Sequence, residues 1–88
     1  MDNNVLQEII NKHKDYLVGY YYDADKSKLS KSLRIICINK KNLNLEINGR
    51  ISFYKENLEF IKVYDLISRK NLVVYFNKYY FFTKKYKT

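Results

Sequence analysis

The stretch Asn71–Lys87, which reads Asn-Leu-Val-Val-Tyr-Phe-Asn-Lys-Tyr-Tyr-Phe-Phe-Thr-Lys-Lys-Tyr-Lys, decides how this chain can fold. It is the part of the sequence richest in β-branched and aromatic residues and it contains no acid, which predicts strand rather than helix. Apolar residues occupy both faces of this strand, whereas in a strand covered on one side only, apolar and polar residues alternate. The run is therefore either a central strand covered twice or a strand folded on itself at Asn77–Lys78.

Two further strands are predicted upstream of this run. Leu33–Asn39 is almost continuously apolar, and Leu58–Tyr64 is a strand with Lys62 in its middle. Lys62 and Lys78 interrupt apolar strands. Native sheets use such charged residues to prevent their edges from pairing with another chain, which is the role predicted for both lysines. Asp65 to Lys70 predicts a capped helical turn.

The segment around Asn48-Gly49 carries the clearest local signal, that of a β-hairpin. A two-residue turn would place Leu43 and Leu45 on the face opposite Ile51, splitting the apolar set. A three-residue connection with a left-handed Gly49 in a bulge keeps them on one face. The sequence therefore predicts a hairpin with an odd-numbered loop.

The amino-terminal segment predicts a helix from about residue 3 to residue 14, because apolar residues recur there at spacings of three and four after capping side chains. His13 falls on the core side, at its rim. From Tyr16 the pattern becomes strand-like, and Gly19 indicates a bulge or a close contact with the helix.

The predicted fold class is α+β: one amino-terminal helix packed on an antiparallel, mostly meandering sheet of five or six strands. A small, partly open β-barrel is the alternative. Residues 1–88 form a single domain with a short basic tail at 84–88, because no linker, repeat or further low-complexity segment divides the chain.

The net charge of +8 comes from 17 Lys and Arg against 9 acids and suggests a polyanionic partner. The acids end at Asp65, so the last quarter of the chain is purely basic. A genome rich in A and T would also enrich Lys, Asn, Ile, Tyr and Phe, so codon usage is a second source of the charge.

The sequence predicts a cytoplasmic protein. It contains neither a signal-peptide pattern nor an apolar run long enough for a membrane span. Cys37 is the single cysteine, so no disulfide forms within one chain, and its position in an apolar strand predicts a buried, inert thiol.

No enzyme, metal or cofactor is predicted. One His and one strand-buried Cys supply no nucleophile with its base, and the two glycines are too far apart for a phosphate-binding loop. Asp23, Asp25 and Ser27 imitate the start of a calcium loop, but Lys28 and Arg34 occupy the positions that require Gly and Glu.

The first functional hypothesis is binding of nucleic acid, with single strands favoured, or of a nucleoprotein assembly. Small antiparallel sheets stack bases on exposed aromatic rings beside basic side chains. The candidate binding residues are the tyrosines and basic residues of the last quarter: Arg69, Lys70, Tyr75, Lys78, Tyr79, Tyr80, Lys84, Lys85 and Lys87.

The second hypothesis is a protein-binding inhibitor or adaptor that masks an acidic partner surface, such as the small anti-defence proteins of phages and mobile elements. Tyrosine is enriched at interfaces, and a two-faced terminal strand needs a cover that one short helix does not supply. A homodimer through that strand is part of this hypothesis. Membrane binding is not expected, because the one amphipathic helix carries few basic residues.

Overall fold

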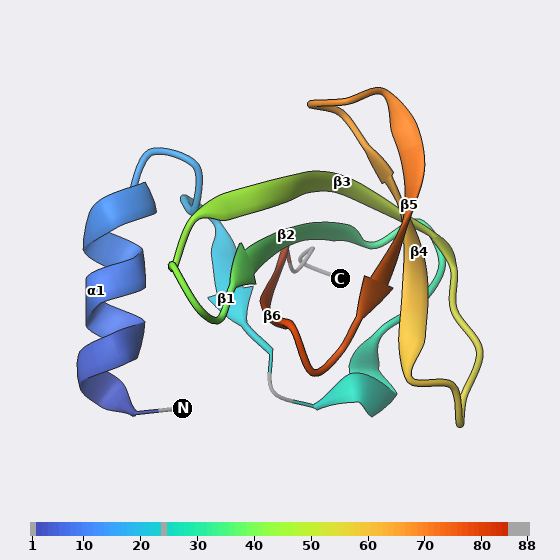
Figure 1. Cartoon of the computed structure of the whole chain (residues 1–88), viewed down its shortest axis with the longest axis horizontal. Coiled ribbons are helices and arrows are strands. Elements are labelled where there is room, and N and C mark those ends of the chain that lie inside the picture. Colours follow the sequence, from blue (N-terminus) through green and yellow to red (C-terminus); the bar gives the residue numbers. More distant parts are fainter. Residues whose placement is uncertain (1, 24, 85–88) are drawn as a thin grey trace.

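The computed structural model describes residues 2–23 and 25–84, apart from the side chain of Lys26. It contains one α-helix and a six-stranded antiparallel sheet (Figure 1), which confirms the predicted α+β class. The elements are α1 (Asn3–His13), β1 (Tyr20–Tyr22), the 3-10 helix η1 (Lys26–Lys28), β2 (Arg34–Asn39), β3 (Leu45–Phe53), β4 (Phe60–Asp65), β5 (Lys70–Tyr75) and β6 (Tyr79–Lys84).

The helix begins where its capping side chain predicts. Asp2 has extended backbone angles, and its carboxylate accepts a hydrogen bond of 2.7 Å from the amide of Asn4, which satisfies one free donor of the first turn. The ring of His13 lies 2.8 Å from the carbonyl oxygen of Leu43. His13 is therefore a half-buried residue at the rim of the core, as predicted.

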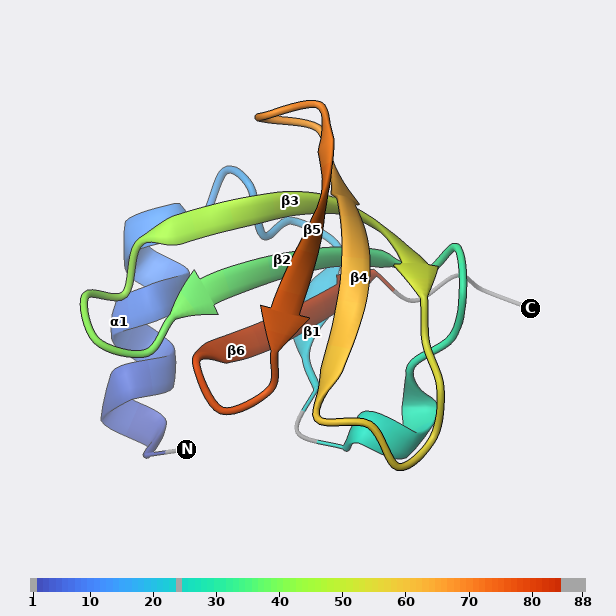
Figure 2. The same cartoon turned by 45° about the vertical axis from the view of Figure 1, so that its right-hand side comes forward.

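The sheet is a meander only from β2 to β5, because the strand order is β1-β6-β2-β3-β4-β5. Three residues, Phe76 to Lys78, join β5 to β6 although three other strands separate them in this order. Four strand spacings of about 4.8 Å in a flat sheet exceed the reach of so short a connection. The sheet must therefore curl, and Figure 2 shows β5 lying in front of β6. It does not close into a barrel.

The curl creates two cores, one on each side of the sheet. Inside the curl, strands β2 to β6 bury one apolar cluster: Leu29, Ile35, Cys37, Ile47, Ile51, Ile61, Val63, Val74 and Phe81. On the outer side, α1 packs over β1, β6 and β2 and buries a second cluster: Ile9, Leu17, Ile36, Ile38 and Phe82. One short helix thus covers only part of the outer side (Figure 1).

The predicted hairpin at Asn48-Gly49 is wrong. Both residues lie inside the continuous strand β3, where Gly49 pairs with Ile35 on one side and with Asp65 on the other. A Cβ atom on Gly49 would overlap the carbonyl oxygen of Tyr64. The glycine therefore permits close approach of two strand backbones, which a strand glycine also signals, and it does not build a turn.

The terminal run divides at Phe76–Lys78, which contains the predicted breakpoint Asn77–Lys78, but its two halves do not pair with each other. The strand predicted from Tyr16 begins only at Tyr20, because Gly19 has a φ of +80° and turns the chain. The capped turn after Asp65 is confirmed: the Asp65 carboxylate accepts a bond of 2.9 Å from the amide of Ser68. Of the predicted basic tail, Lys84 ends β6, and residues 85–88 lie outside the described residues.

Candidate nucleic-acid interface

The outer side of the sheet has an uncovered half formed by β4, β5 and the end of β3. Among the described residues, no helix lies over it, because α1 sits at the opposite end of the sheet (Figure 1). We call this half the open face and define it by six residues: Phe53, Phe60, Lys62, Tyr64, Val73 and Tyr75.

The period of two along a strand explains why these side chains point outward. Along β4, Ile61 and Val63 are fully buried inside the curl, so their neighbours must face the other way. Phe60 pairs with Tyr75 of β5 in the sheet register. The two strands thus present one shared row of outward side chains.

The aromatic rings of the open face form a connected series. The ring of Phe60 lies 6.3 Å from the ring of Phe53, at an interplanar angle of 25°, and 6.0 Å from the ring of Tyr75. Phe53 is 37% exposed, Tyr75 46% and Tyr64 41%. These side chains are therefore partly accessible to a ligand.

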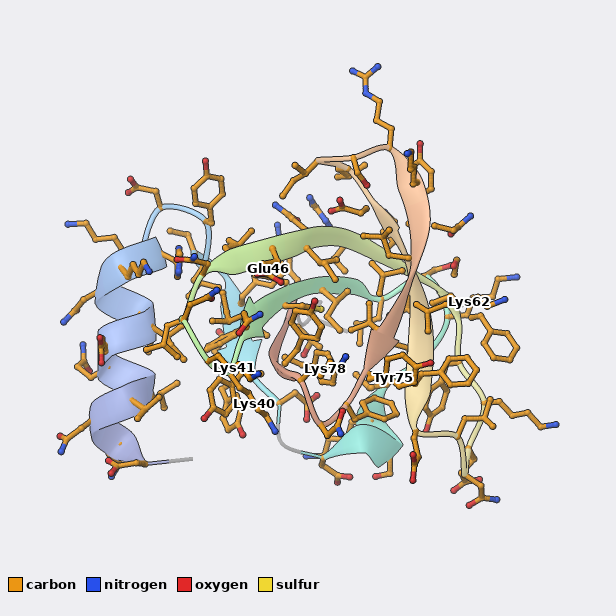
Figure 3. The ribbon with its side chains drawn as sticks, in the orientation of Figure 1. Lys40, Lys41, Glu46, Lys62, Tyr75 and Lys78 are labelled. Atoms are coloured by element: carbon orange, nitrogen blue, oxygen red, sulfur yellow. The ribbon has the colours of Figure 1, made fainter. Side chains whose placement is uncertain are left out.

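Two ammonium groups accompany these rings. The Nζ atom of Lys62 lies 5.6 Å from the ring centroid of Phe53, and that of Lys78 lies 5.7 Å from the ring centroid of Tyr75. Figure 3 labels Lys62, Tyr75 and Lys78, which lie on neighbouring parts of the molecule. These distances are within the range of cation–π contacts. Arg50, exposed and paired with Tyr64 in the sheet register, adds a third cation.

The structure brings together only part of the predicted binding residues. Tyr75 and Lys78 lie at one end of the open face, and Arg69 and Lys70 lie at the far end of the same β4–β5 hairpin. Lys84 lies on β6, opposite Tyr20 of β1, which is the other edge of the sheet. The predicted residues Lys85 and Lys87 lie outside the described residues.

Tyr79 and Tyr80 do not join Tyr75, because consecutive residues of β6 point to opposite sides of the sheet. The Tyr79 hydroxyl donates a 3.1 Å hydrogen bond to Glu46 on the inner side. Burial raises the pKa of Tyr79, and the bond to Glu46 raises it further. Tyr80 packs in the cluster beneath α1, with the Nζ atom of Lys40 5.4 Å from its ring centroid.

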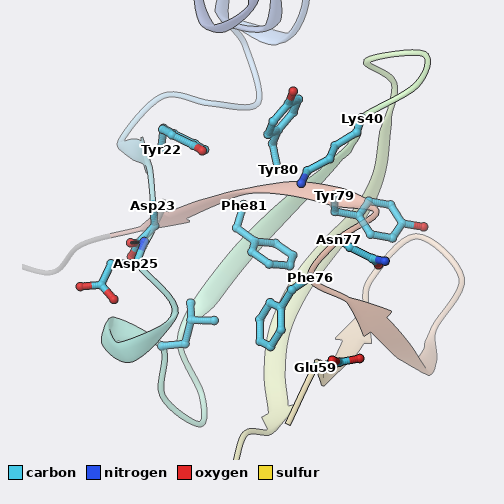
Figure 4. A pocket seen from close by; sticks show the side chains of 11 residues that line it. Tyr22, Asp23, Asp25, Lys40, Glu59, Phe76, Asn77, Tyr79, Tyr80 and Phe81 are labelled. Atoms are coloured by element: carbon cyan, nitrogen blue, oxygen red, sulfur yellow. Dashed lines mark hydrogen bonds between the residues drawn. The ribbon is translucent and has the colours of Figure 1, made fainter. Parts of the chain in front are cut away.

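Both tyrosines instead line a hollow of about 400 Å³ at the mouth of the curl (Figure 4). Among the side chains that the structure describes, three carboxylates line it, from Asp23, Asp25 and Glu59, and one cation, Lys40. The side-chain and backbone hydrogen bonds from Ser27 lower the pKa of Asp25, which keeps it charged. This surplus of negative charge disfavours phosphate, so the hollow is a poor site for a polyanion.

The described residues contain no group of three His, Cys, Asp or Glu side chains able to hold a metal ion. Cys37 is fully buried, and burial raises the pKa of its thiol, which disfavours the reactive thiolate form. Within residues 2–23 and 25–84, no helix has the length and apolar composition needed to cross a membrane.

Comparison with protein-family models, curated proteins and solved structures found no match. The open face must therefore be interpreted from its own chemistry.

The sequence did not single out Phe53, Phe60, Lys62 and Tyr64, four residues of the open face, as candidate binding residues. The signal was present, since the alternation from Phe60 to Tyr64 places Phe, Lys and Tyr on one side and Ile61 and Val63 on the other. The sequence predicts for Lys62 only a role in blocking edge-to-edge strand pairing. Lys62 lies instead on an inner strand, between β3 and β5.

Proposed function

We propose that the chain binds single-stranded nucleic acid on the open face, without catalysis. The observation that carries the proposal is the row of rings formed by the exposed Phe53 and Tyr75 and the half-buried Phe60 between them. Lys62 and Lys78 lie beside this row, on a sheet surface that α1 leaves uncovered. Bases stack on aromatic side chains because every base has a π face, and each stacked base contributes about 1 to 3 kcal/mol.

The geometry favours single strands over duplex. Bases held inside a duplex cannot reach rings on a sheet, whereas unstacked bases can lie flat against them. A row of this length suits about two or three bases, as in other small sheets that stack bases. The cations would contact phosphates, which carry no sequence information. Little sequence preference is therefore expected.

The test is a fluorescence-anisotropy titration against labelled single-stranded DNA, RNA and duplex. If Arg50, Lys62 and Lys78 each contact one phosphate, the logarithmic salt slope is about −2, and affinity falls about twentyfold between about 50 and about 200 mM salt. A preference for duplex, or no binding at the lower salt, would contradict the proposal.

Replacing Tyr75 with Ala supplies the sharper test, because Tyr75 is half-exposed and its loss should leave the fold intact. Affinity for single strands should fall about 5- to 150-fold, which corresponds to one lost stacking contact. Tyr21→Ala is the matched control: Tyr21 is similarly exposed, at 58%, but lies on β1 at the opposite edge of the sheet. Equal losses in both variants would exclude the open face as the site.

Binding of an acidic protein surface is the second candidate, and the tip of the β4–β5 hairpin favours it. Leu66 and Ile67 are both more than half exposed there, and aliphatic side chains of this kind suit a protein pocket better than a phosphate backbone. This role predicts that replacing both residues with Ser leaves nucleic-acid affinity unchanged.

A further inference from the structure

The two edges of the sheet differ in how well they are protected against pairing with another strand. β1 is only three residues long, whereas β5 has six residues and pairs with β4 over its whole length without a register shift. Native proteins protect edges with short strands, bulges, proline or charge. On β5 the only such feature is Lys70, at its first residue.

The backbone of β5 offers hydrogen-bonding groups to a further strand. The amide of Phe76 donates to the carbonyl oxygen of Glu59, and bonded pairs alternate along an antiparallel ladder. Val74 and Leu72 therefore bond to β4, while Asn71 and Val73 direct their N–H and C=O groups away from it. In the part of the chain that the structure describes, no strand pairs with that side of β5.

The sequence of β5 is complementary to itself in one antiparallel register, with Leu72 opposite Leu72 of a second copy. Asn71 of each copy then lies opposite Val73 of the other, which allows four backbone hydrogen bonds. In this register the side chains of both copies that point outward lie on one side of the joined sheet. A shift by one residue would place every side chain of the second copy on the opposite side. The pairing stops before Tyr75, whose carbonyl oxygen accepts the amide of Lys78 in the turn to β6.

The charges of β5 permit this register. Lys70 is the only charged residue of the strand, and it lies opposite Val74 of the second copy. The two Lys70 residues are then four positions apart along the ladder, about 14 Å at about 3.4 Å per residue. That separation exceeds the Debye length of about 10 Å at 0.1 M salt, so their repulsion is largely screened.

We propose that β5 is the docking edge for a second copy of this chain, which joins two sheets into one through a symmetric dimer centred on Leu72. The contact surface is isologous, as in most homodimers. Since opposed residues share a side, the two open faces lie on the same side of the joined sheet and stay uncovered. The dimer does not depend on nucleic-acid binding, because its hydrogen bonds are made by the backbone edge of β5 and not by the rings of the open face.

A small interface of backbone bonds and a few apolar side chains predicts a weak dimer, of about micromolar affinity. Sedimentation velocity without nucleic acid, from about 1 µM to about 1 mM protein, should show a concentration-dependent shift from monomer to dimer. A protein that stays monomeric over this range would overturn the proposal. Failure to bind nucleic acid in the separate titration would leave the dimer unaffected.

The variant Val73→Pro tests the edge itself. The Val73 amide points away from β4, so proline removes a donor to the second copy and spares the ladder within the chain. We expect this variant to remain monomeric at every concentration, with a circular dichroism spectrum like that of the parent protein. Val73→Thr keeps the amide and the β-branched shape and should dimerise. Persistent dimerisation of Val73→Pro would show that another surface is used.

Cross-linking tests the register. Leu72 and Leu72 of the second copy form a non-hydrogen-bonded pair, in which the Cα atoms lie about 4.5 Å apart. A disulfide can span this separation. Leu72→Cys should therefore form a disulfide-linked dimer under mild oxidation. Val73→Cys should not, because its two copies are offset by two residues. Cys37 is buried and does not compete. No cross-link in Leu72→Cys, or one in Val73→Cys alone, would overturn the register.

Discussion

The outer side of the sheet has two halves with the same strand period but different surroundings. In the half beneath α1, the outward residues Ile36, Ile38 and Phe82 are almost completely buried. In the open half, the outward residues Tyr64 and Tyr75 are more than 40% exposed. The first half is aliphatic and aromatic, whereas the second mixes rings with lysine. An apolar outward row becomes core only when another element covers it, so the uncovered row is the surface available to a partner.

The two halves should differ most in how much free energy of unfolding is lost when an aromatic ring is removed. Phe82→Ala should lower the free energy of unfolding by about 3 to 5 kcal/mol, because it deletes a buried ring from the cluster beneath α1. Phe60→Ala should cost only about 1 kcal/mol, because part of that ring remains in water. Urea unfolding of both variants measures the difference. Equal costs would show that the open face is packed as tightly as the covered one.

Gly49→Ala should have the next largest effect on the free energy of unfolding. Gly49 lies where β3 passes from the covered half to the open half. The added methyl group would overlap the backbone carbonyl of Tyr64, which cannot rotate away as a side chain would. We expect a loss of about 3 kcal/mol in the free energy of unfolding. Gly19→Ala tests a different cause of strain, the positive φ of a turn, since a Cβ atom there has only an ordinary contact with Lys84. An unchanged unfolding midpoint for Gly49→Ala would contradict the close strand contact.

Asp65→Asn should lower the free energy of unfolding by about 1 to 3 kcal/mol, because Asp65 at the end of β4 accepts a hydrogen bond from β3. Its buried carboxylate accepts the amides of Asn48, at 3.0 Å, and of Ser68. Burial alone would raise the pKa of Asp65, but these hydrogen bonds, with others from the hairpin turn, lower it overall.

The lowered pKa of Asp65 gives this stabilisation a defined pH dependence. The full contribution is present above the unfolded pKa of about 3.9 and disappears as the pH falls through the lower pKa of the folded state. Unfolding experiments should show a constant gap between the parent protein and Asp65→Asn from about pH 5 to pH 7 that narrows below about pH 4. A gap that widens in acid would mean that the protonated form is the one stabilised.

Lys62→Gln should have the smallest effect on the fold and should change only binding at the open half. Stability should change by less than about 0.5 kcal/mol, since Lys62 is exposed. The slope of log affinity for single strands against log salt should become less steep by about 0.7, the value for one lost phosphate contact. Lys14→Gln removes the same charge at the end of α1 and should leave the slope unchanged. Equal changes in both variants would attribute binding to net charge alone.

Local sequence patterns predicted the elements better than their arrangement. The Asp2 cap, the helix, and the strands around Ile36 and Val63 follow from short-range chemistry and are observed. The Asn48-Gly49 signal failed because glycine serves both turns and close strand contacts, and only the neighbouring strand distinguishes them. The site was predicted in part: Tyr75 and Lys78 lie together, but Tyr79 and Tyr80 point to opposite sides of β6.

The sequence by itself determined an antiparallel sheet with one capped helix, a basic and tyrosine-rich surface, and the absence of a recognisable catalytic motif, because composition, caps and strand periods act over a few residues. Only the tertiary structure decided that β6 enters between β1 and β2, that α1 covers one half of the outer side, and that Phe53, Phe60 and Tyr75 meet on the other half. These features depend on contacts between residues far apart in the chain, and local periodicity does not encode which strands become neighbours.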